Sequence, residues 1–239
     1  MNDRHAQRFL RAVKIPVQTG HWHDHRAAPF YLALPNLDAC RRLLIGAPVT
    51  REVQLPPKYV TNRNRTGNQV NDILALFSSA RRDGNTGRLI DRVARDLPLE
   101  VIDLAEKRIA TYTYDHRHRD DDFEPLMTHL LTFDRLLFAS PVYWYSVTAP
   151  MKTFLDRISD YLDLPELLDQ GRRLREKTAY VICTSVMEAP APSFIDAFQQ
   201  TFEYLGMRFG GYVHANCVDG YVPERYETDV AAFTDLIRT

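Results

Sequence analysis

The sequence predicts an α/β fold in which a five-stranded parallel sheet lies between two layers of helices. From residue 72 onward, continuous apolar runs of strand length alternate with segments whose apolar residues recur at helical spacing. The apolar runs do not alternate with polar residues, which is typical of parallel strands that are buried on both faces. In such a sheet, ligands bind beyond the carboxyl ends of the strands, so the loops that follow the strands are the candidate sites.

Each element of the predicted sheet can be justified in chain order. The first strand covers residues 73–77, and the helix after it places Leu89, Ile90, Val93 and Leu97 on one face. The later predicted strands are residues 99–104, 135–140, 178–184 and 209–217. The later predicted helices are residues 123–131, 149–162, 194–205 and 224–237.

The charge distribution divides the chain near residue 71. The whole chain of 239 residues has a formal charge of -1, with 45% hydrophobic and 26% charged residues, which excludes a disordered protein and a strongly basic nucleic-acid binder. Residues 1–71 carry eleven basic and four acidic side chains, a net charge of +7, and residues 72–239 carry nineteen and twenty-seven, a net charge of -8. We therefore predict a basic N-terminal extension and linker at 1–71 and one folded domain at 72–239.

Cysteine usage and hydropathy predict a cytoplasmic protein. Three cysteines are too few for a disulfide framework and indicate a reducing compartment. The longest uncharged run, residues 136–151, is shorter than the roughly 20 apolar residues of a membrane helix and contains Pro141 and Pro150. The first residues are charged and lack the apolar stretch of a secretory signal.

The loop after the first strand is rich in hydrogen-bond donors. Residues 78–86 read S-S-A-R-R-D-G-N-T, which lacks the glycine pattern of a dinucleotide turn or a nucleotide P-loop. A helix begins there with free backbone amides, so the loop suits a terminal phosphate. The alternative is an ordinary capping turn.

The loop after the third strand contains three consecutive aromatic residues, Tyr143, Trp144 and Tyr145, between two prolines. They lie in neither a helix nor a strand, and exposed aromatic residues indicate binding. A flat ring system along this loop would account for them, with the backbone amides from Val142 onward free to bond its polar edge. Packing against a partner subunit is the alternative, and the two are compatible.

These two loops resemble those of a known family. Residues 79–86 resemble an S-x-R-x-x-G-N-T phosphate loop, and residues 140–144 with 149–157 resemble the flavin loop and following helix of flavodoxin-like NAD(P)H-dependent FMN reductases. The resemblance, which covers about residues 72–220, implies a three-layer sandwich with strand order 2-1-3-4-5, bound FMN, and a homodimer or homotetramer. It also implies electron transfer from NADPH or NADH to a small acceptor such as a quinone, flavin, azo compound or metal ion.

The resemblance assigns cofactor-binding roles position by position. The phosphate contacts are implied for Ser79, Arg81, Asn85 and Thr86, and the isoalloxazine contacts for Pro141, Val142, Tyr143 and Trp144. After the fourth strand the family often has a glycine-rich turn against the flavin, where this chain has T-S-V-M-E-A-P, so Thr184 and Ser185 are the remaining candidates. No catalytic side chain is predicted, because the flavin itself transfers hydride.

Other features give alternatives of different classes. A flavodoxin-type electron carrier, or a flavin-binding regulatory protein acting through residues 1–71, would carry the same loops. His21, His23 and His25 would share one face of a strand, but nothing in the sequence supports them further, and no metal site is predicted. The charged loop around His116 and His118 is expected to form a solvated lid beside the flavin, and nucleic-acid binding is not expected.

Overall fold

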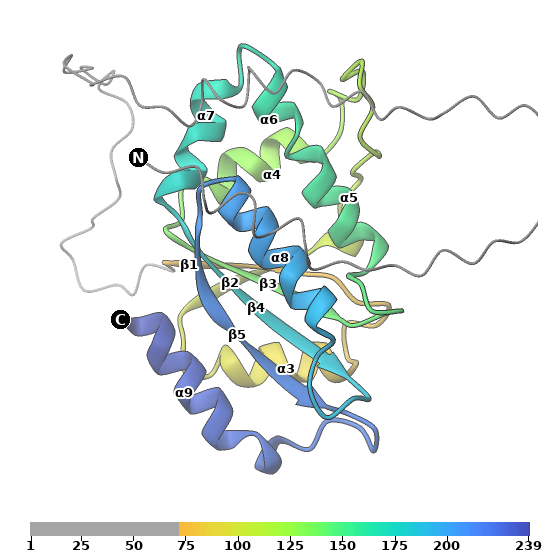
Figure 1. The fold of residues 1–239 in the computed structure, drawn as a ribbon, viewed down its shortest axis with the longest axis vertical. Helices are drawn as coiled ribbons and strands as arrows, with labels where there is room; N and C mark the ends of the chain where they lie inside the picture. The colour runs from red at the N-terminus through yellow and green to blue at the C-terminus, as the bar shows by residue number, and fades with distance from the viewer. Residues whose placement is uncertain (1–71) are drawn as a thin grey trace, which may run out of the picture. The chain divides into compact units, whose positions relative to one another are not determined.

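The computed structural model describes residues 72–239, which form a parallel sheet with helices on both faces (Figure 1). The strands are β1 (Ile73–Phe77), β2 (Leu99–Asp103), β3 (Arg135–Pro141), β4 (Thr178–Ser185) and β5 (Arg208–Asn216). Their order is β2-β1-β3-β4-β5, and every pairing is parallel. The predicted fold class and strand order are confirmed. The extension at 1–71 and the histidines at 21, 23 and 25 lie outside the described residues.

The helices follow the strands as the alternating pattern predicts. They are α3 (Asn85–Val93), α4 (Phe123–Leu130), α5 (Ala149–Arg157), α6 (Asp160–Asp163), α7 (Leu168–Arg172), α8 (Pro192–Tyr204) and α9 (Glu227–Arg238), with 3₁₀ turns at Leu104–Glu106, Arg173–Glu176 and Pro223–Arg225. In Figure 1, α3 and α9 lie on one side of the sheet and α4, α5 and α8 on the other.

The helix expected at residues 149–162 is wrong in one respect, because it is divided into α5 and α6. The amide of Ile158 donates to Leu155 O at 3.2 Å, and that of Tyr161 donates to Ile158 O at 2.9 Å. These bonds span three residues instead of four, which tightens the chain between the two helices. The apolar spacing of the sequence continues across the break and does not reveal it.

Two apolar cores hold the three layers together. Alternate strand residues such as Leu74 and Phe138 pack on one face against α4, α5 and α8. Ile73 and Phe77 pack on the other face against α3 and α9. All five residues of β1 are buried, because β1 lies inside the sheet with a helical layer on each face.

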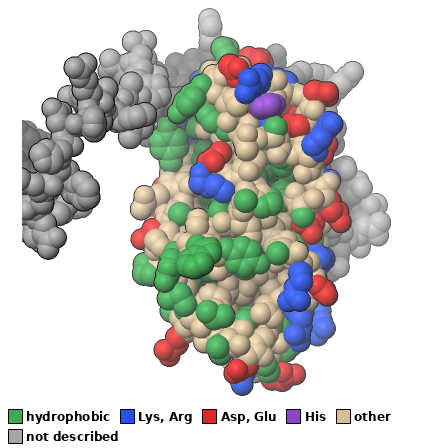
Figure 2. All heavy atoms as spheres, turned by 90° about the vertical axis from the view of Figure 1, so that its right-hand side faces the viewer, with side chains coloured by type: hydrophobic (Ala, Val, Ile, Leu, Met, Phe, Trp, Pro, Cys, Tyr) green, Lys and Arg blue, Asp and Glu red, His purple; other side chains and the backbone are tan. Residues whose placement is uncertain are grey.

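The carboxyl ends of the strands meet at one edge of the sheet, which lies on the right-hand side of Figure 1. Figure 2 faces that side and shows hydrophobic side chains gathered across the middle of the surface. The exposed large apolar residues of the β3–α5 and β4–α8 loops are Tyr143, Trp144, Tyr145, Val186 and Met187. This edge is where a doubly wound sheet binds its ligands.

Candidate flavin site

The loop between β1 and α3 leaves the first turn of a helix open. Gly84 is the residue that precedes α3, and no side chain caps the helix. The side-chain capping that the alternative interpretation of this loop would use is therefore not found at α3. The backbone amides of the first turn point out of the helix, and the positive end of the helix dipole favours an anion there.

Gly87 permits the tight course of this loop. A Cβ atom at Gly87 would lie 1.7 Å from the carbonyl oxygen of Arg82, whereas one at Gly84 would lie 3.2 Å from Arg81 O. The backbone of the loop thus passes directly over the first turn of α3, and only glycine fits at position 87. Gly87 directly follows the predicted phosphate-loop motif at residues 79–86 and was not predicted as a site residue.

The polar side chains of the loop differ in the partners they have. Arg82 pairs with Asp91 at 2.6 Å, whereas Arg81 is exposed and has no carboxylate partner among residues 72–239. The side-chain oxygen of Asn85 accepts a hydrogen bond from the backbone amide of Tyr221 at 3.1 Å. This leaves the amide nitrogen of Asn85 to donate. Arg81, Asn85 and the open helix end together form a set of donors that suits a phosphate monoester.

Two buried pairs of hydroxyl groups join this loop to the end of β4 and to the start of α5. The hydroxyl oxygens of Thr86 and Thr184 are 2.7 Å apart, and those of Ser78 and Thr148 are 2.5 Å apart. Thr148 also donates its backbone amide to the side-chain oxygen of Ser140 at 3.2 Å. Ser78 belongs to the donor-rich loop predicted to suit a phosphate but was assigned no contact of its own, and Thr148 was not predicted as a site residue. The only signal of Thr148 in the sequence is its position directly before α5.

The aromatic loop after β3 ends in a tight, strained turn. Tyr143 and Ser146 exchange backbone hydrogen bonds of 2.9 and 3.0 Å, and the φ angles of Trp144 and Tyr145 are 48° and 64°. Positive φ at both central positions defines a type I′ turn, which usually contains Asn and Gly. Bulky residues in this conformation are strained, and such strain is found mostly at functional sites.

The prediction that the backbone amides of the aromatic loop are free from Val142 onward is wrong for the first two of them. The amide of Val142 donates to Thr184 O at 2.9 Å, and the amide of Tyr143 is used within the turn. What the turn presents to solvent is its side chains: Trp144 is 93% exposed and Tyr145 is 61% exposed. The sequence located the aromatic residues but not the turn that projects them.

Ser185 holds the start of the β4–α8 loop. Its side-chain oxygen accepts from the amide of Met187 at 3.0 Å and lies 2.8 Å from Nε2 of His214. Burial lowers the pKa of His214, which favours the neutral imidazole. Ser185 is thus occupied in shaping the loop, and its contact with a flavin stays a prediction, as does that of Thr184.

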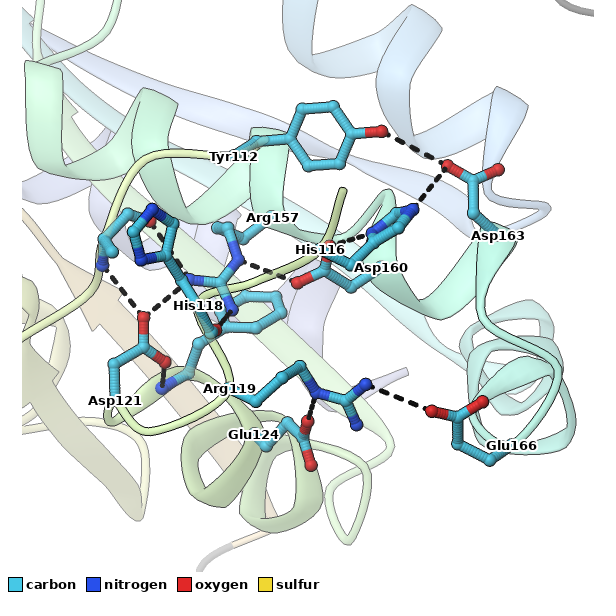
Figure 3. Close-up of polar contacts among 12 residues, drawn as sticks. Tyr112, His116, His118, Arg119, Asp121, Glu124, Arg157, Asp160, Asp163 and Glu166 are labelled. Atoms are coloured by element: carbon cyan, nitrogen blue, oxygen red, sulfur yellow. Dashed lines mark hydrogen bonds and ion pairs between the residues drawn. The ribbon is translucent and has the colours of Figure 1, made fainter. Parts of the chain in front are cut away.

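The charged loop between β2 and α4 is anchored by a buried arginine (Figure 3). Arg157 on α5 donates to Asp121 at 2.6 Å, to Asp160 at 2.8 Å, and to the carbonyl oxygens of Ala110 and His118 at 3.1 and 2.6 Å. Its side chain is only 2% exposed. The expectation of a solvated lid is therefore wrong for this part of the loop, because the lid interpretation took its charges to face water.

The electrostatics of this anchor favour the ionised form of Asp121. Burial alone would raise the pKa of Asp121, but the hydrogen bonds from the backbone amide of Ala110 and from Arg157 outweigh it, so the pKa lies below its ordinary value. His116 Nδ1 lies 2.8 Å from Asp160 Oδ1, which ties a second point of the loop to α6. Tyr112 reaches Asp163 at 3.3 Å, as Figure 3 shows.

Within residues 72–239, no three His, Cys, Asp or Glu side chains are grouped as metal ligands would be. In the same part of the chain, no helix has the length and apolar character needed to cross a membrane.

The parallel sheet with strand order β2-β1-β3-β4-β5 and helices on both faces defines a class, the flavodoxin-like proteins. Residues 71–216 match the model of the NADPH-dependent FMN reductase family, and the chain belongs to that family. It is accordingly an oxidoreductase that uses FMN as its cofactor and NAD(P)H as its electron donor.

Individual proteins similar to this chain include one FMN-containing oxidoreductase and two solved structures. The putative NAD(P)H-dependent FMN-containing oxidoreductase YwqN of Bacillus subtilis is 29% identical over 150 residues, which cover 59% of this chain and 82% of the relative. The solved structure of the Trp repressor binding protein from Bacillus subtilis is 28% identical with a TM-score of 0.53, covering 69% of this chain and 98% of that one. A putative quinone reductase from Klebsiella pneumoniae, 16% identical with a TM-score of 0.50 over 70% of this chain and 83% of that one, shares the fold.

Proposed function

We propose that the chain uses the three loops at the carboxyl edge of the sheet to hold FMN and to pass electrons from NADPH or NADH to a small acceptor. The observation that supports this most directly is the pair of hydroxyl contacts, Thr86–Thr184 and Ser78–Thr148, which join the open end of α3 to the loops beside the aromatic turn. A phosphate at α3 and a flat ring at the turn would then belong to one ligand. FMN, when bound, supplies the redox chemistry.

Ser79, Arg81, Asn85 and Thr86 are proposed to hold the phosphate. Arg81 contributes a guanidinium without a carboxylate partner in residues 72–239, and Asn85 contributes its amide nitrogen. Charge-assisted hydrogen bonds of this kind are the strong ones in anion recognition. The first-turn amides of α3 add donors that need no side chain.

Pro141, Val142, Tyr143 and Trp144 are proposed to line the ring system. Pro141 is buried at the end of β3 and Val142 is partly buried, so they form a fixed floor, while Trp144 projects into solvent. This combination favours a ligand that lies flat on the floor and leaves one face open. An open face suits transfer of electrons to a diffusible acceptor.

The acceptor is proposed to be a small molecule of the quinone, flavin, azo or metal-ion classes. No side chain is proposed as a general acid or base, since this chain's part is to bind, orient and exclude water. The exposed apolar side chains of the aromatic turn and of Val186 also suit contact with a second copy, as a homodimer or homotetramer would provide. The cytoplasmic location stays a prediction.

An absorption spectrum and an anaerobic titration test the proposal. The purified full-length protein should show flavin bands, and NADPH or NADH should bleach them within seconds. A protein that stays oxidised for minutes in the presence of both nucleotides would instead be an electron carrier.

Truncation tests the alternative in which the extension does the work. A chain lacking residues 1–71 should keep NAD(P)H oxidation with menadione, a dye or ferricyanide as acceptor. Loss of all turnover with FMN still bound would favour a function that depends on the extension.

A further inference from the structure

We propose that Thr184 and Thr148 are positioning residues for the phosphate of FMN, acting through the hydroxyl groups of Thr86 and Ser78. This inference rests on the proposed function, since it assumes a phosphate at the start of α3. It adds two residues outside the phosphate loop, 98 and 70 positions along the chain from their partners.

One hydroxyl proton of the first pair has no acceptor among residues 72–239. Thr86 and Thr184 each carry one hydroxyl proton, and the 2.7 Å contact between their oxygens uses one of the two. Thr86 is 1% exposed and Thr184 is 4% exposed, so water does not take the second proton. Among residues 72–239, neither hydroxyl has another acceptor. A buried donor without an acceptor is costly, which points to a ligand as the missing partner.

The direction of the first pair follows from the place of each residue. Thr86 lies in the open first turn of α3, whereas Thr184 lies in β4 with its carbonyl bonded to the amide of Val142. If Thr184 donates to Thr86, the proton of Thr86 is left to point toward an anion at the helix end. Thr184 then orients that donor without touching the phosphate.

The second pair repeats the arrangement on the other side of the loop. Ser78 and Thr148 are 1% and 5% exposed, and their oxygens are 2.5 Å apart. Thr148 is fixed by its backbone amide, which donates to Ser140 Oγ at 3.2 Å. Donation from Thr148 to Ser78 leaves the Ser78 proton beside the phosphate loop. Two oriented donors, one directly after β1 and one in the first turn of α3, would thus reach one anion.

A buried threonine elsewhere in the domain, Thr234, behaves differently. Thr234 in α9 is 1% exposed, and its hydroxyl donates to the backbone carbonyl of Ala231 at 2.9 Å. This local bond to the preceding turn satisfies the hydroxyl proton within the helix. Thr86, although it also lies in a helix, bonds instead to a side chain from a distant strand. Thr234 therefore provides a matched control.

The test compares FMN with riboflavin, which has the same ring but no phosphate. Full-length Thr184→Val and Thr148→Val proteins are dialysed against a series of concentrations of each flavin, and bound flavin is measured. We expect FMN to bind roughly tenfold more weakly to each variant and riboflavin to bind within about twofold of wild type. Thr184→Ser should restore FMN affinity, and Thr234→Val should change neither affinity.

The outcomes separate the inference from the proposed function. A wild-type protein that binds riboflavin as tightly as FMN would overturn both, because no phosphate would then be recognised. If wild type prefers FMN but Thr184→Val and Thr148→Val keep that preference, the inference alone fails. Equal weakening of both flavins would also refute it, since a structural defect acts on the ring as well. If Thr184→Val does not fold, Thr184→Ala and Thr148→Val decide.

Discussion

Replacing Gly87 by alanine is the sharpest perturbation of the phosphate loop, because its outcome depends on a single close approach. The new methyl carbon would lie 1.7 Å from Arg82 O. An ordinary carbon–oxygen contact is about 3.3 Å, so the loop must move away from α3 by about 1.6 Å. That displacement carries Arg81 and Ser79 away from the helix end.

The expected magnitude follows from the bonds that this displacement breaks. Loss of one or two charge-assisted hydrogen bonds corresponds to about 1.5–3 kcal/mol, or roughly a 10- to 100-fold weaker FMN affinity. The intrinsic preference of helices for alanine over glycine acts in the opposite direction, by about 1 kcal/mol in the free energy of unfolding. The steric conflict therefore predicts weaker FMN binding, whereas helix propensity alone predicts a more stable protein with unchanged FMN binding.

Fluorescence titration of FMN and urea denaturation measure the two effects separately. Gly84→Ala is the matched control, because its methyl group would lie 3.2 Å from Arg81 O, a contact that small shifts relieve. We expect Gly84→Ala to bind FMN within a few-fold of wild type and Gly87→Ala to bind it roughly 10- to 100-fold more weakly. A Gly87→Ala protein that is more stable than wild type and binds FMN normally would refute the loop geometry.

Three further predictions concern the anchor and the aromatic turn. Arg157→Leu should lower the free energy of unfolding in urea by about 3–5 kcal/mol, because Asp121 and Asp160 are left buried without their cation; a loss below about 1 kcal/mol would contradict this. Because the pKa of Asp121 is lowered in the folded state, its ionised form stabilises the fold above about pH 4, and this contribution is lost as the pH falls through the folded-state pKa. The difference in unfolding free energy between wild type and Asp121→Asn should therefore shrink in acid. A difference that is independent of pH from about 3 to 6 would speak against this. The double variant Trp144→Asn, Tyr145→Gly should have a free energy of unfolding about 1–3 kcal/mol higher than wild type, because an Asn-Gly pair adopts the type I′ turn without strain. A double variant that is less stable than wild type would show that the turn is not strained.

The sheet could be predicted from the sequence because its strands are buried on both faces. Residues 73–77 form an uninterrupted apolar run, and the structure places β1 at those residues between two helical layers. The apolar composition of residues 73–77 is therefore sufficient to predict this strand. The break between α5 and α6 could not be predicted in this way, since it depends on the three-residue hydrogen bonds at Ile158 and Tyr161.

The candidate site could be predicted only in part, because some of it is made of contacts between residues far apart in the sequence. Arg81 and Asn85 are recognisable from local spacing in the phosphate loop. The contact of Thr86 with Thr184 depends on the order of the strands, which brings residues 98 positions apart together. Arg157 likewise looks like one charge among many in the sequence, and only the structure shows that it is buried.

The hydroxyl pairs also affect when the cofactor site can form during folding. The phosphate loop is complete once α3 has folded, but Thr86 has no partner until β4 has joined the sheet beside β3. Contacts of such sequence separation form late, because the intervening chain must first be ordered. A growing chain that has emerged only as far as β3 would contain the whole loop motif and still lack both Thr148 and Thr184, the residues proposed to orient its donors. Flavin capture is in this sense a property of the finished sheet.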